Sequence, residues 1–372
     1  MTGRLRAQVR TGDTVARLGG DEFAIIQRQI NDADETQVLG KRIIQAISEP
    51  YSLSGHKIHI GASIGIELIK GMYVDPDEVM RNADVALYKA KAEGRGCFRS
   101  FDPELHSVLG KRRLTETNLR RAITDPNAFE IHYQPQFDIK TNSVTGFEAL
   151  VRWRDPVRGL IPPSEFIGVA EETGLIDKIG HFVLERACED ALSWPDHVSV
   201  AVNLSAVQFK TSRVAEVVVA ALDRTGLPPR RIDLEITETV MLEDDKRAIC
   251  TLSHLKRLGA RISLDDFGTG FSSLSFLRRF PFDRIKIDQS FVRDMADNAG
   301  SMAIIRAVIS ICRSMGIDSI AEGIETPEQL AWLAKEGCDS VQGYLLGRPM
   351  KLADATALFA PRPRPMLRAV AG

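Results

Sequence analysis

Short runs rich in β-branched residues alternate with longer helix-like segments from about residue 129 onward. Eight of these runs are predicted strands, and they cover residues 129–137, 144–153, 198–204, 232–237, 261–266, 284–288, 318–322 and 340–345. The helices predicted between them cover residues 175–193, 213–225, 244–258, 299–315 and 327–336, and the last four end at a glycine. This α/β pattern in roughly 230 residues favours a closed (β/α)₈ barrel over an open doubly wound sheet.

The connection between the first two predicted strands departs from the repeating pattern. Only residues 138–143 separate these strands, whereas a crossover between parallel strands needs about a dozen residues or more. We therefore expect the first strand of the barrel to run antiparallel to the second.

The first hundred residues predict a second, smaller α/β unit. Residues 15–26 contain two strand-like runs around a Gly-Gly turn, which is typical of a hairpin. A helix at 33–48, a strand at 58–67 and a helix at 77–92 follow, so only a thin sheet supports two helices and the unit is expected to be incomplete. The predicted division of the chain is a partial domain at 1–102, a helical linker at 103–113, the barrel domain at 114–358 and a tail at 359–372.

Composition excludes several classes of partner. The chain has 48 Lys and Arg residues against 50 Asp and Glu residues, so no global field attracts DNA or an anionic membrane. The basic residues between 103 and 126 have no interleaved aromatic residues and favour a solvated connector over a nucleic-acid surface. No long apolar segment and no signal-peptide core occur, and the five cysteines are widely spaced. We expect a cytoplasmic protein without membrane insertion or disulfides.

Acidic and amide side chains lie near the C-terminal ends of most predicted barrel strands. They are Glu148, Asn203, Glu235, Glu238, Asp265, Asp266, Glu322 and Gln342. Barrel enzymes carry their chemistry at this rim, and converging carboxylates need cations to neutralise them. Oxygen ligands without His or Cys favour Mg²⁺ or Mn²⁺. The adjacent pair Asp265 and Asp266 suggests two ions, the arrangement that clamps a phosphoryl displacement.

Two basic residues lie at the same rim. Arg152 shares a strand face with Glu148 and suits a phosphate oxygen. Lys286 lies between two isoleucines, and its expected uses are to orient the attacking water or to offset charge at the metal site. Any one of the acids alone is better explained as a surface cap or a salt-bridge partner, but random placement does not put an acid or amide at the mouth end of most strands. The glycine-containing segment after Asp266 lacks the third glycine of a dinucleotide-binding loop.

At these residues the chain resembles the bacterial GGDEF-EAL tandem proteins of cyclic di-GMP signalling. Residues 114–358 contain seven motifs of an EAL phosphodiesterase domain in order. They are Glu148-Ala-Leu150-Val-Arg152, Asn203-Leu-Ser, Glu235-Ile-Thr-Glu238, Asp265-Asp-Phe-Gly-Thr-Gly270, Lys286-Ile-Asp288, Ala321-Glu322-Gly-Ile-Glu325 and Gln342-Gly-Tyr344. The resemblance implies a TIM-like barrel with one reversed strand that hydrolyses cyclic di-GMP to linear pGpG with two Mg²⁺ or Mn²⁺ ions. It also implies a homodimer through the EAL domain.

The same resemblance assigns roles to individual residues. Glu148, Asn203, Glu235 and Asp265 would hold one ion, and Asp265, Asp266 and Glu322 would hold the other. The catalytic set would be Lys286, Glu148 and Glu322, with Lys286 positioning the water. Leu150, Arg152 and Gln342 would contact the substrate, and Glu238 would support the loop at 267–273.

The front unit resembles the second part of a GGDEF diguanylate cyclase domain. It contains Gly19, Gly20, Asp21 and Glu22 of the signature, and Lys91 and Arg95, which would reach GTP phosphates. Arg10 and Asp13 have the spacing of the inhibitory cyclic di-GMP site of the family. The metal-binding Asp of the first strand and the residues that read guanine have no counterpart. We therefore predict no cyclase activity.

Two other functions compete with hydrolysis. A non-catalytic cyclic di-GMP receptor would be expected to have lost metal ligands, and all of them are present here. A metal-dependent barrel lyase of the enolase kind would place acids and a lysine similarly but would not explain the Glu-Ala-Leu or Asp-Phe-Gly-Thr-Gly segments.

Overall fold

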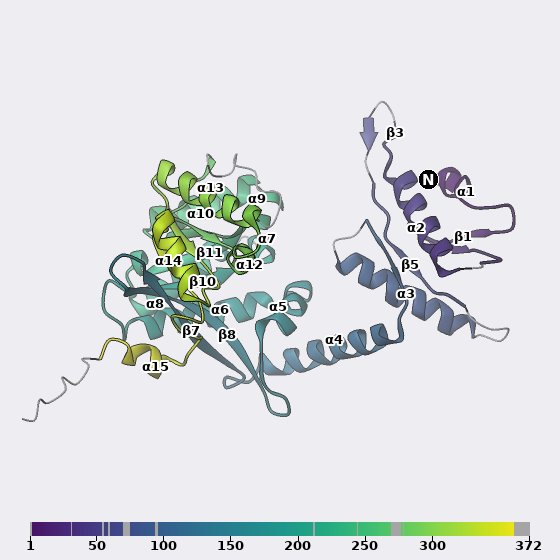
Figure 1. The fold of residues 1–372 in the computed structure, drawn as a ribbon. Coiled ribbons are helices and arrows are strands. Elements are labelled where there is room, and N and C mark those ends of the chain that lie inside the picture. The colour runs from purple at the N-terminus through teal and green to yellow at the C-terminus, as the bar shows by residue number, and fades with distance from the viewer. Residues whose placement is uncertain are drawn as a thin grey trace, which may run out of the picture. The chain divides into compact units, whose positions relative to one another are not determined.

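The fold was analysed in a computed structural model, which describes residues 2–30, 32–53, 56–58, 60–69, 75–93, 96–210, 213–243, 245–268, 277 and 279–360. The chain divides into two compact units, Met1–Leu114 and Thr115–Gly372. Each unit has its own buried apolar cluster. Figure 1 labels most of the helices and several of the strands of both units.

The second unit is built on a closed barrel. Its strands are β7 (Phe129–Asp138), β8 (Ser143–Asp155), β10 (Ser199–Leu204), β11 (Ile232–Thr237), β12 (Arg261–Phe267), β13 (Arg284–Ile287), β14 (Asp318–Ala321) and β15 (Ser340–Val341). They pair in the order β10 to β15, then β7 and β8, and β8 pairs with β10 to close the ring. β7 is antiparallel to both β8 and β15, which confirms the predicted reversal. β9 (Gly159–Ile161) extends β8 as a hairpin.

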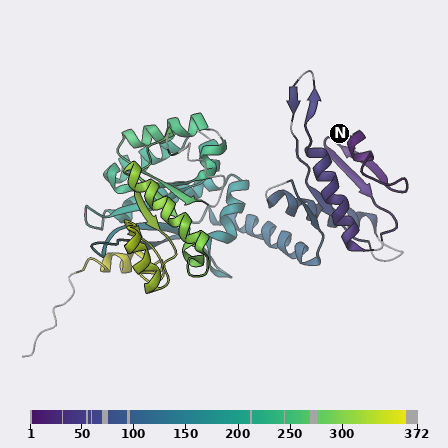
Figure 2. The same cartoon turned by 45° about the horizontal axis from the view of Figure 1, so that its top comes forward.

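Helices cover the outside of the barrel, as Figures 1 and 2 show from two directions. They are α5 (Pro163–Glu172), α6 (Ile176–Ala191), α7 (Ala206–Lys210), α8 (Val214–Thr225), α9 (Glu238–Glu243), α10 (Asp245–Arg257), α12 (Gln289–Asp294), α13 (Ala299–Met315), α14 (Pro327–Glu336) and α15 (Leu352–Ala357), with a 3₁₀ turn at Pro229–Arg231. The five predicted helices are confirmed, and Gly226, Gly316 and Gly337 end theirs in the left-handed conformation. Helices α5, α7, α9, α12 and α15 were not predicted from the sequence.

The last barrel strand is shorter than predicted. It ends at Val341 rather than at residue 345, because the backbone of Gln342 turns to accept a hydrogen bond from the N–H of Ile324 at 3.1 Å. A Cβ on Gly343 would lie 2.2 Å from the backbone N and O of Ile324, so only glycine allows this close approach. The turn leaves the Gln342 side chain inside the barrel.

Strand β11 illustrates where the core of this unit lies. Ile232, Leu234 and Ile236 are fully buried and alternate with Asp233 and Glu235 along the strand. Because successive side chains point to opposite faces, the apolar residues pack toward the helices and the two acids face the barrel interior. The hydrophobic core therefore lies between strands and helices, and the interior is left for charged groups.

The first unit contains short strands and longer helices. Its elements are α1 (Thr2–Arg6), β1 (Thr14–Gly19), β2 (Glu22–Ile26), α2 (Ala33–Ser48), β3 (Tyr51–Leu53), β4 (His56–Ile58), β5 (Ile64–Ile66), α3 (Pro76–Ala92), β6 (Phe98–Ser100) and α4 (Pro103–Ala122). The predicted hairpin and both helices are confirmed, and α4 is a helix that spans the predicted linker at 103–113 and continues to Ala122. The single strand predicted at 58–67 is wrong, because β4 pairs with β3 whereas β5 pairs with β6.

Within the described residues the strands of this unit form three separate pairs rather than one sheet. Helix α3 packs directly on β5 at Gly65, where a Cβ would lie 2.0 Å from the backbone O of Ala83. No helix in the described part of the chain is long and apolar enough to cross a membrane.

Candidate active site at the barrel mouth

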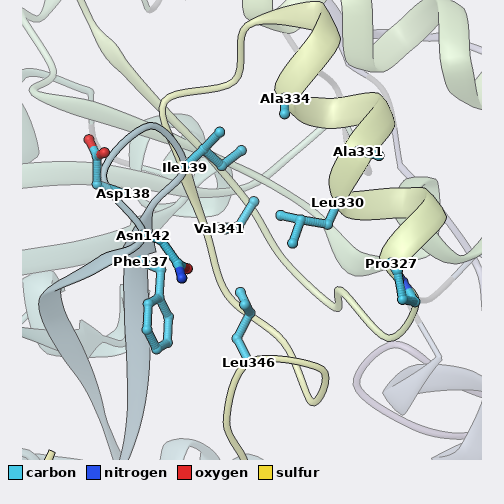
Figure 3. A pocket seen from close by; sticks show the side chains of 10 residues that line it. All are labelled: Phe137, Asp138, Ile139, Asn142, Pro327, Leu330, Ala331, Ala334, Val341 and Leu346. Atoms are coloured by element: carbon cyan, nitrogen blue, oxygen red, sulfur yellow. The ribbon is translucent and has the colours of Figure 1, made fainter.

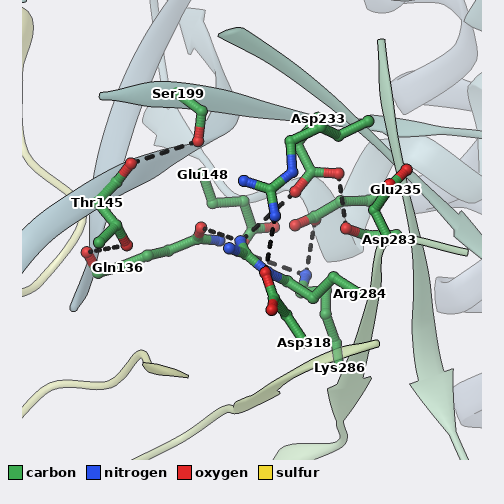
Figure 4. Close-up of polar contacts among 12 residues, drawn as sticks. Gln136, Thr145, Glu148, Ser199, Asp233, Glu235, Asp283, Arg284, Lys286 and Asp318 are labelled. Atoms are coloured by element: carbon green, nitrogen blue, oxygen red, sulfur yellow. Dashed lines mark hydrogen bonds and ion pairs between the residues drawn. The ribbon is translucent and has the colours of Figure 1, made fainter. Parts of the chain in front are cut away.

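Four carboxylates surround the ammonium group of Lys286 inside the barrel. Lys286 lies on β13 and is 1% exposed. Its Nζ lies 2.6 Å from Glu235 Oε2, 2.7 Å from Glu322 Oε1, 3.2 Å from Asp265 Oδ2 and 3.8 Å from Glu148 Oε2. The acids come from β11, β12, β8 and the end of β14, and Figure 4 shows Glu148 and Glu235 converging on the lysine. The structure thus brings together the acids predicted from separate strands.

One ammonium group does not neutralise the four carboxylates around it. Burial raises the pKa of Glu235 well above its ordinary value, although Lys286 opposes the shift. Burial likewise raises the pKa of Glu322 to about 8. Burial alone would lower the pKa of Lys286, but the carboxylates around it raise that pKa well above the ordinary value. The cluster therefore carries excess negative charge that protons or cations must neutralise.

Asp265 and Asp266 reach the same rim because β12 is irregular at this point. The pairing of β12 with β13 shifts register between Leu264 and Phe267, and Asp266 has a φ of 54°. The left-handed backbone at Asp266 is unusual for a residue with a side chain and re-aims it. Burial, followed by repulsion from Asp265, raises the pKa of Asp266 to about 6. Its carboxylate therefore belongs to the electrostatic environment of the cluster.

Glu148 is held from both sides by amide groups. Asn203 Nδ2 donates to Glu148 Oε1 at 2.7 Å, and Gln342 Nε2 donates to Glu148 Oε2 at 2.5 Å. Gln342 is 4% exposed, so the residue expected to contact substrate lies directly against a carboxylate of the cluster. Asn203 remains exposed at the mouth.

Leu150 and Arg152 continue the strand face of Glu148 toward the mouth, and both are half-buried. Arg152 Nη1 donates to the backbone O of Val151 at 3.0 Å. Burial lowers the pKa of Arg152, while Tyr344 and Glu148 act in the opposite direction. The guanidinium therefore lies beside the carboxylate cluster with further donors available for an anion.

Glu238 contacts the loop that follows β12. Its Oε1 accepts a hydrogen bond from the backbone N–H of Gly268 at 3.0 Å. Residues 269–273 lie outside the described residues, so the contact with Gly268 is the part of the predicted loop support that can be observed.

The signature of the first unit forms a tight hairpin. Gly19 ends β1, Glu22 begins β2 and Gly20 has a φ of 51°. Asp21 completes the turn, and both acids are exposed. Lys91 is exposed on α3, and Arg95 lies outside the described residues.

Asp13 ties two backbone segments together. Its carboxylate accepts hydrogen bonds from the N–H groups of Arg28 at 3.0 Å and Arg10 at 2.9 Å, and these bonds hold its pKa below the ordinary value. The Arg10 guanidinium pairs with Glu35 at 3.5 Å. Both residues of the predicted inhibitory site therefore also have local structural roles.

The side chains at the mouth suit hard cations, because each of the predicted ligands offers an oxygen. Glu235 Oε1 is buried and has no hydrogen-bond partner among the described residues, as expected of a ligand atom. As they stand, however, no three His, Cys, Asp or Glu side chains of the described residues are arranged to hold a metal ion. Lys286 Nζ instead lies among the acids, and it pairs with Glu235 through Oε2, which leaves Oε1 without a hydrogen-bond partner among the described residues.

Polar residues that the sequence analysis did not assign also face the barrel interior. Gln134 and Gln136 alternate on β7, and Asp233 and Arg284 lie two residues before Glu235 and Lys286 on their strands. All four are buried. The signal that could have found them is a polar residue at every second position of a strand whose other face is apolar.

A pocket of about 310 Å³ lies elsewhere, between α14 and the turn that joins β7 to β8 (Figure 3). Leu330, Ala331 and Val341 give it an apolar wall, and Asp138 is the one titratable side chain among the described residues that line it. Asp138 already accepts hydrogen bonds from Thr141 at 2.7 and 2.8 Å. This pocket therefore lacks the chemistry of the barrel mouth.

Comparisons with known proteins agree with this geometry. Residues 116–349 match the EAL domain, and residues 1–97 match the diguanylate cyclase GGDEF domain. The chain is 40% identical over 361 residues to the bifunctional diguanylate cyclase/cyclic di-GMP phosphodiesterase MucR of Pseudomonas aeruginosa, covering 96% of this chain and 52% of MucR. It is 37% identical over 339 residues to the cyclic di-GMP phosphodiesterase PdeR of Escherichia coli, covering 90% of this chain and 51% of PdeR.

A solved structure of the PaMucR phosphodiesterase in complex with c-di-GMP is 39% identical, with a TM-score of 0.63, and the match covers 65% of this chain and 99% of that one. The chain spans about half the length of the curated relatives it matches. The tandem order of the two matched domains confirms the predicted resemblance. The chain therefore belongs to the EAL domain family, and its first 97 residues match the GGDEF domain.

Proposed function

We propose that the barrel unit hydrolyses cyclic di-GMP to linear pGpG with two divalent cations, Mg²⁺ or Mn²⁺. The family membership and the named activities of MucR and PdeR support hydrolysis of this dinucleotide. The barrel domain at 114–358 would carry the activity, and 1–102, 103–113 and 359–372 would be the partial domain, the linker and the tail.

The charge of the cluster is the observation that carries the two-cation proposal. Glu148, Glu235, Asp265, Asp266 and Glu322 are five carboxylates, and Lys286 is the one ammonium group among them. If all are ionised, the net charge of about −4 matches the charge of two divalent cations. Burial raises the pKa of both Glu235 and Glu322, so ionised carboxylates at this site need that compensation.

Each side chain has a defined part in the proposed reaction. Glu148, Asn203, Glu235 and Asp265 would hold one cation, and Asp265, Asp266 and Glu322 the other. The cations, when bound, would supply charge compensation at the phosphodiester and activation of the attacking water. Lys286 would orient that water, while Leu150, Arg152 and Gln342 would contact the substrate. Glu238 would support the loop after β12 through Gly268.

Product analysis tests this function directly. The purified chain is incubated with cyclic di-GMP and Mg²⁺ or Mn²⁺, and the nucleotides are separated by chromatography. Linear pGpG is the expected product. Bound but unchanged cyclic di-GMP would instead indicate the non-catalytic receptor, and absence of both binding and turnover would contradict both functions.

We further propose that the first unit has no cyclase activity. Glu22 and Lys91 are exposed on separate elements and would keep only part of a GTP site. Incubation with GTP and Mg²⁺ is expected to yield no cyclic di-GMP, and formation of that product would contradict the proposal. Any cyclic di-GMP effect of this unit would be regulatory and would involve Arg10 and Asp13.

A homodimer through the EAL domain is also proposed, and light scattering of the purified chain tests it.

The pH dependence of stability follows from the raised carboxyl pKa values. The pKa of Glu322 rises from 4.5 to about 8 through burial, and that of Asp266 rises from 3.8 to about 6. At a pH between the ordinary and the raised pKa of each group, the folded chain binds more protons than the unfolded chain. The stability of the metal-free protein therefore falls as pH rises from about 4.5 to 8. Cations bind the deprotonated acids, so Mg²⁺ should stabilise the protein more at pH 8 than at pH 5.

Thermal unfolding at both pH values, with Mg²⁺ or with a chelator, measures this effect. Turnover should follow the same direction and be greater at pH 8. Equal turnover at pH 5 and pH 8, or equal stabilisation by Mg²⁺, would contradict the assignment of these carboxylates as ligands.

A further inference from the structure

A second layer of buried polar groups lies inside the barrel, two residues before the Lys286 cluster along β11 and β13 (Figure 4). Asp233 is 0% exposed, Arg284 is 4% exposed and Gln136 is 1% exposed. Apolar branched residues usually fill barrel interiors, and burial of an ion pair often costs more than its attraction returns. Packing alone therefore does not explain this layer.

Arg284 is the centre of the layer. Its Nη1 donates to Gln136 Oε1 at 3.1 Å and lies 3.4 Å from Asp233 Oδ2. Ser263 Oγ donates to Asp233 Oδ1 at 2.6 Å, which fixes the carboxylate that accompanies the guanidinium. Contacts from β11 and β12 thus hold the guanidinium of Arg284, on β13, beside Gln136 on β7.

Gln136 links this layer to the cluster at the mouth. Its Nε2 donates to Gln342 Oε1 at 3.0 Å. Gln342 Nε2 in turn donates to Glu148 Oε2 at 2.5 Å and to Gln134 Oε1 at 3.1 Å. A continuous series of hydrogen bonds therefore runs from Arg284 to Glu148.

The direction of this series follows from donor chemistry. A guanidinium group has five N–H donors and no acceptor, so Gln136 must turn its carbonyl oxygen toward Arg284. The amide nitrogen of Gln136 then faces Gln342 and requires an oxygen there. Only the amide nitrogen of Gln342 remains to face Glu148, where a carbonyl oxygen would repel the carboxylate.

We propose that Arg284 is a positioning residue for the hydrolysis, because it sets the orientation of Gln136 and Gln342 and thereby aims an N–H donor at Glu148. This inference rests on the proposed function of the barrel. Without Arg284 the amide of Gln136 can turn over, and only Gln134 Oε1 then opposes a turn of Gln342 that would take its N–H donor from Glu148 Oε2.

Three variants and a matched control test the proposal. Replacing Arg284→Met should lower kcat by about 10- to 100-fold, as loss of an outer hydrogen-bond partner does, with a much smaller change in KM. Arg284→Lys should retain kcat within about 5-fold, because an ammonium group also only donates. The double variant Asp233→Leu with Arg284→Met removes the unpaired buried charge, so it should regain thermal stability but remain slow.

Arg231 provides the control. It is also buried, at 3% exposed, but its guanidinium donates to the backbone oxygens of Val198, Ala191 and Trp194. Arg231→Met should lower the melting temperature and leave kcat of the folded protein unchanged. A normal kcat in Arg284→Met or in the double variant, or equal loss in Arg231→Met and Arg284→Met, would overturn the positioning role.

A readout independent of turnover separates this inference from the proposed function. The side-chain NH₂ protons of Gln136 and Gln342 should exchange slowly with solvent in the wild-type chain by NMR. Their protection should be lost in Arg284→Met and kept in Arg284→Lys. Protection that survives in Arg284→Met would contradict the inference even if the wild-type chain did not hydrolyse cyclic di-GMP, whereas absent wild-type turnover with the expected exchange pattern would contradict only the proposed function.

Discussion

Replacing Glu148 with alanine is expected to abolish hydrolysis of cyclic di-GMP, with a loss in kcat of about 10³-fold or more. Glu148 is buried, lies 3.8 Å from Lys286 Nζ and is held by Asn203 and Gln342. Its removal takes one charge from the cluster, leaves Asn203 Nδ2 without this acceptor and leaves Gln342 Nε2 with Gln134 Oε1. Chromatographic assay of pGpG at saturating substrate measures the effect.

Glu336 offers a matched control for this variant. Its carboxylate accepts a hydrogen bond from Arg306 at 2.8 Å at the end of α14, outside the barrel. Glu336→Ala removes a glutamate from an ion pair but leaves the mouth intact, so turnover should remain at the wild-type value. Retained activity in Glu148→Ala would remove the ligand assignment, and equal losses in the two variants would indicate a general folding defect.

Replacing Lys286 with methionine should have two large effects. Turnover should be lost because the group that orients the water is gone. In the metal-free protein at pH 8, the free energy of unfolding should fall by about 3–5 kcal/mol, because the carboxylates lose the buried ammonium group that pairs with them. Mg²⁺ should restore part of this stability, and the loss should be smaller at pH 5, where the acids accept protons more readily.

Urea unfolding in a chelator and in Mg²⁺ measures these changes. Lys256 pairs with Asp283 at 3.0 Å and is partly exposed, so Lys256→Met should change stability by about 1 kcal/mol or less. A Lys286→Met protein as stable as wild type without metal would show that the acids do not depend on the lysine.

The predicted barrel and its reversed strand were accessible from sequence because both depend on local spacing. The interval 138–143 is too short for a parallel crossover, and the structure has β7 antiparallel to β8. Helix α5 was missed because Pro162 and Pro163 resemble a loop, although proline is well tolerated in the first turn of a helix.

The rim location of the acids was also predictable, whereas their arrangement was not. Lys286 was expected to offset charge, but its position among four carboxylates depends on strands far apart in sequence. The bulge at Asp266 depends on the register of β12 with β13. The bond between Arg284 and Gln136 joins residues 148 positions apart, which no local pattern reveals.

The seam between β7 and β15 has a consequence for biosynthesis. It consists of the pairs Ser340 with Asp138 and Val341 with Phe137. The first strand of the barrel therefore cannot complete its hydrogen bonds until the last strand has been synthesised. Closing so long a loop is entropically costly and slow. A nascent chain therefore cannot assemble Gln342 with Glu148 until β15 has left the ribosome, and hydrolytic capacity should appear abruptly once that strand has paired with β7 rather than strand by strand.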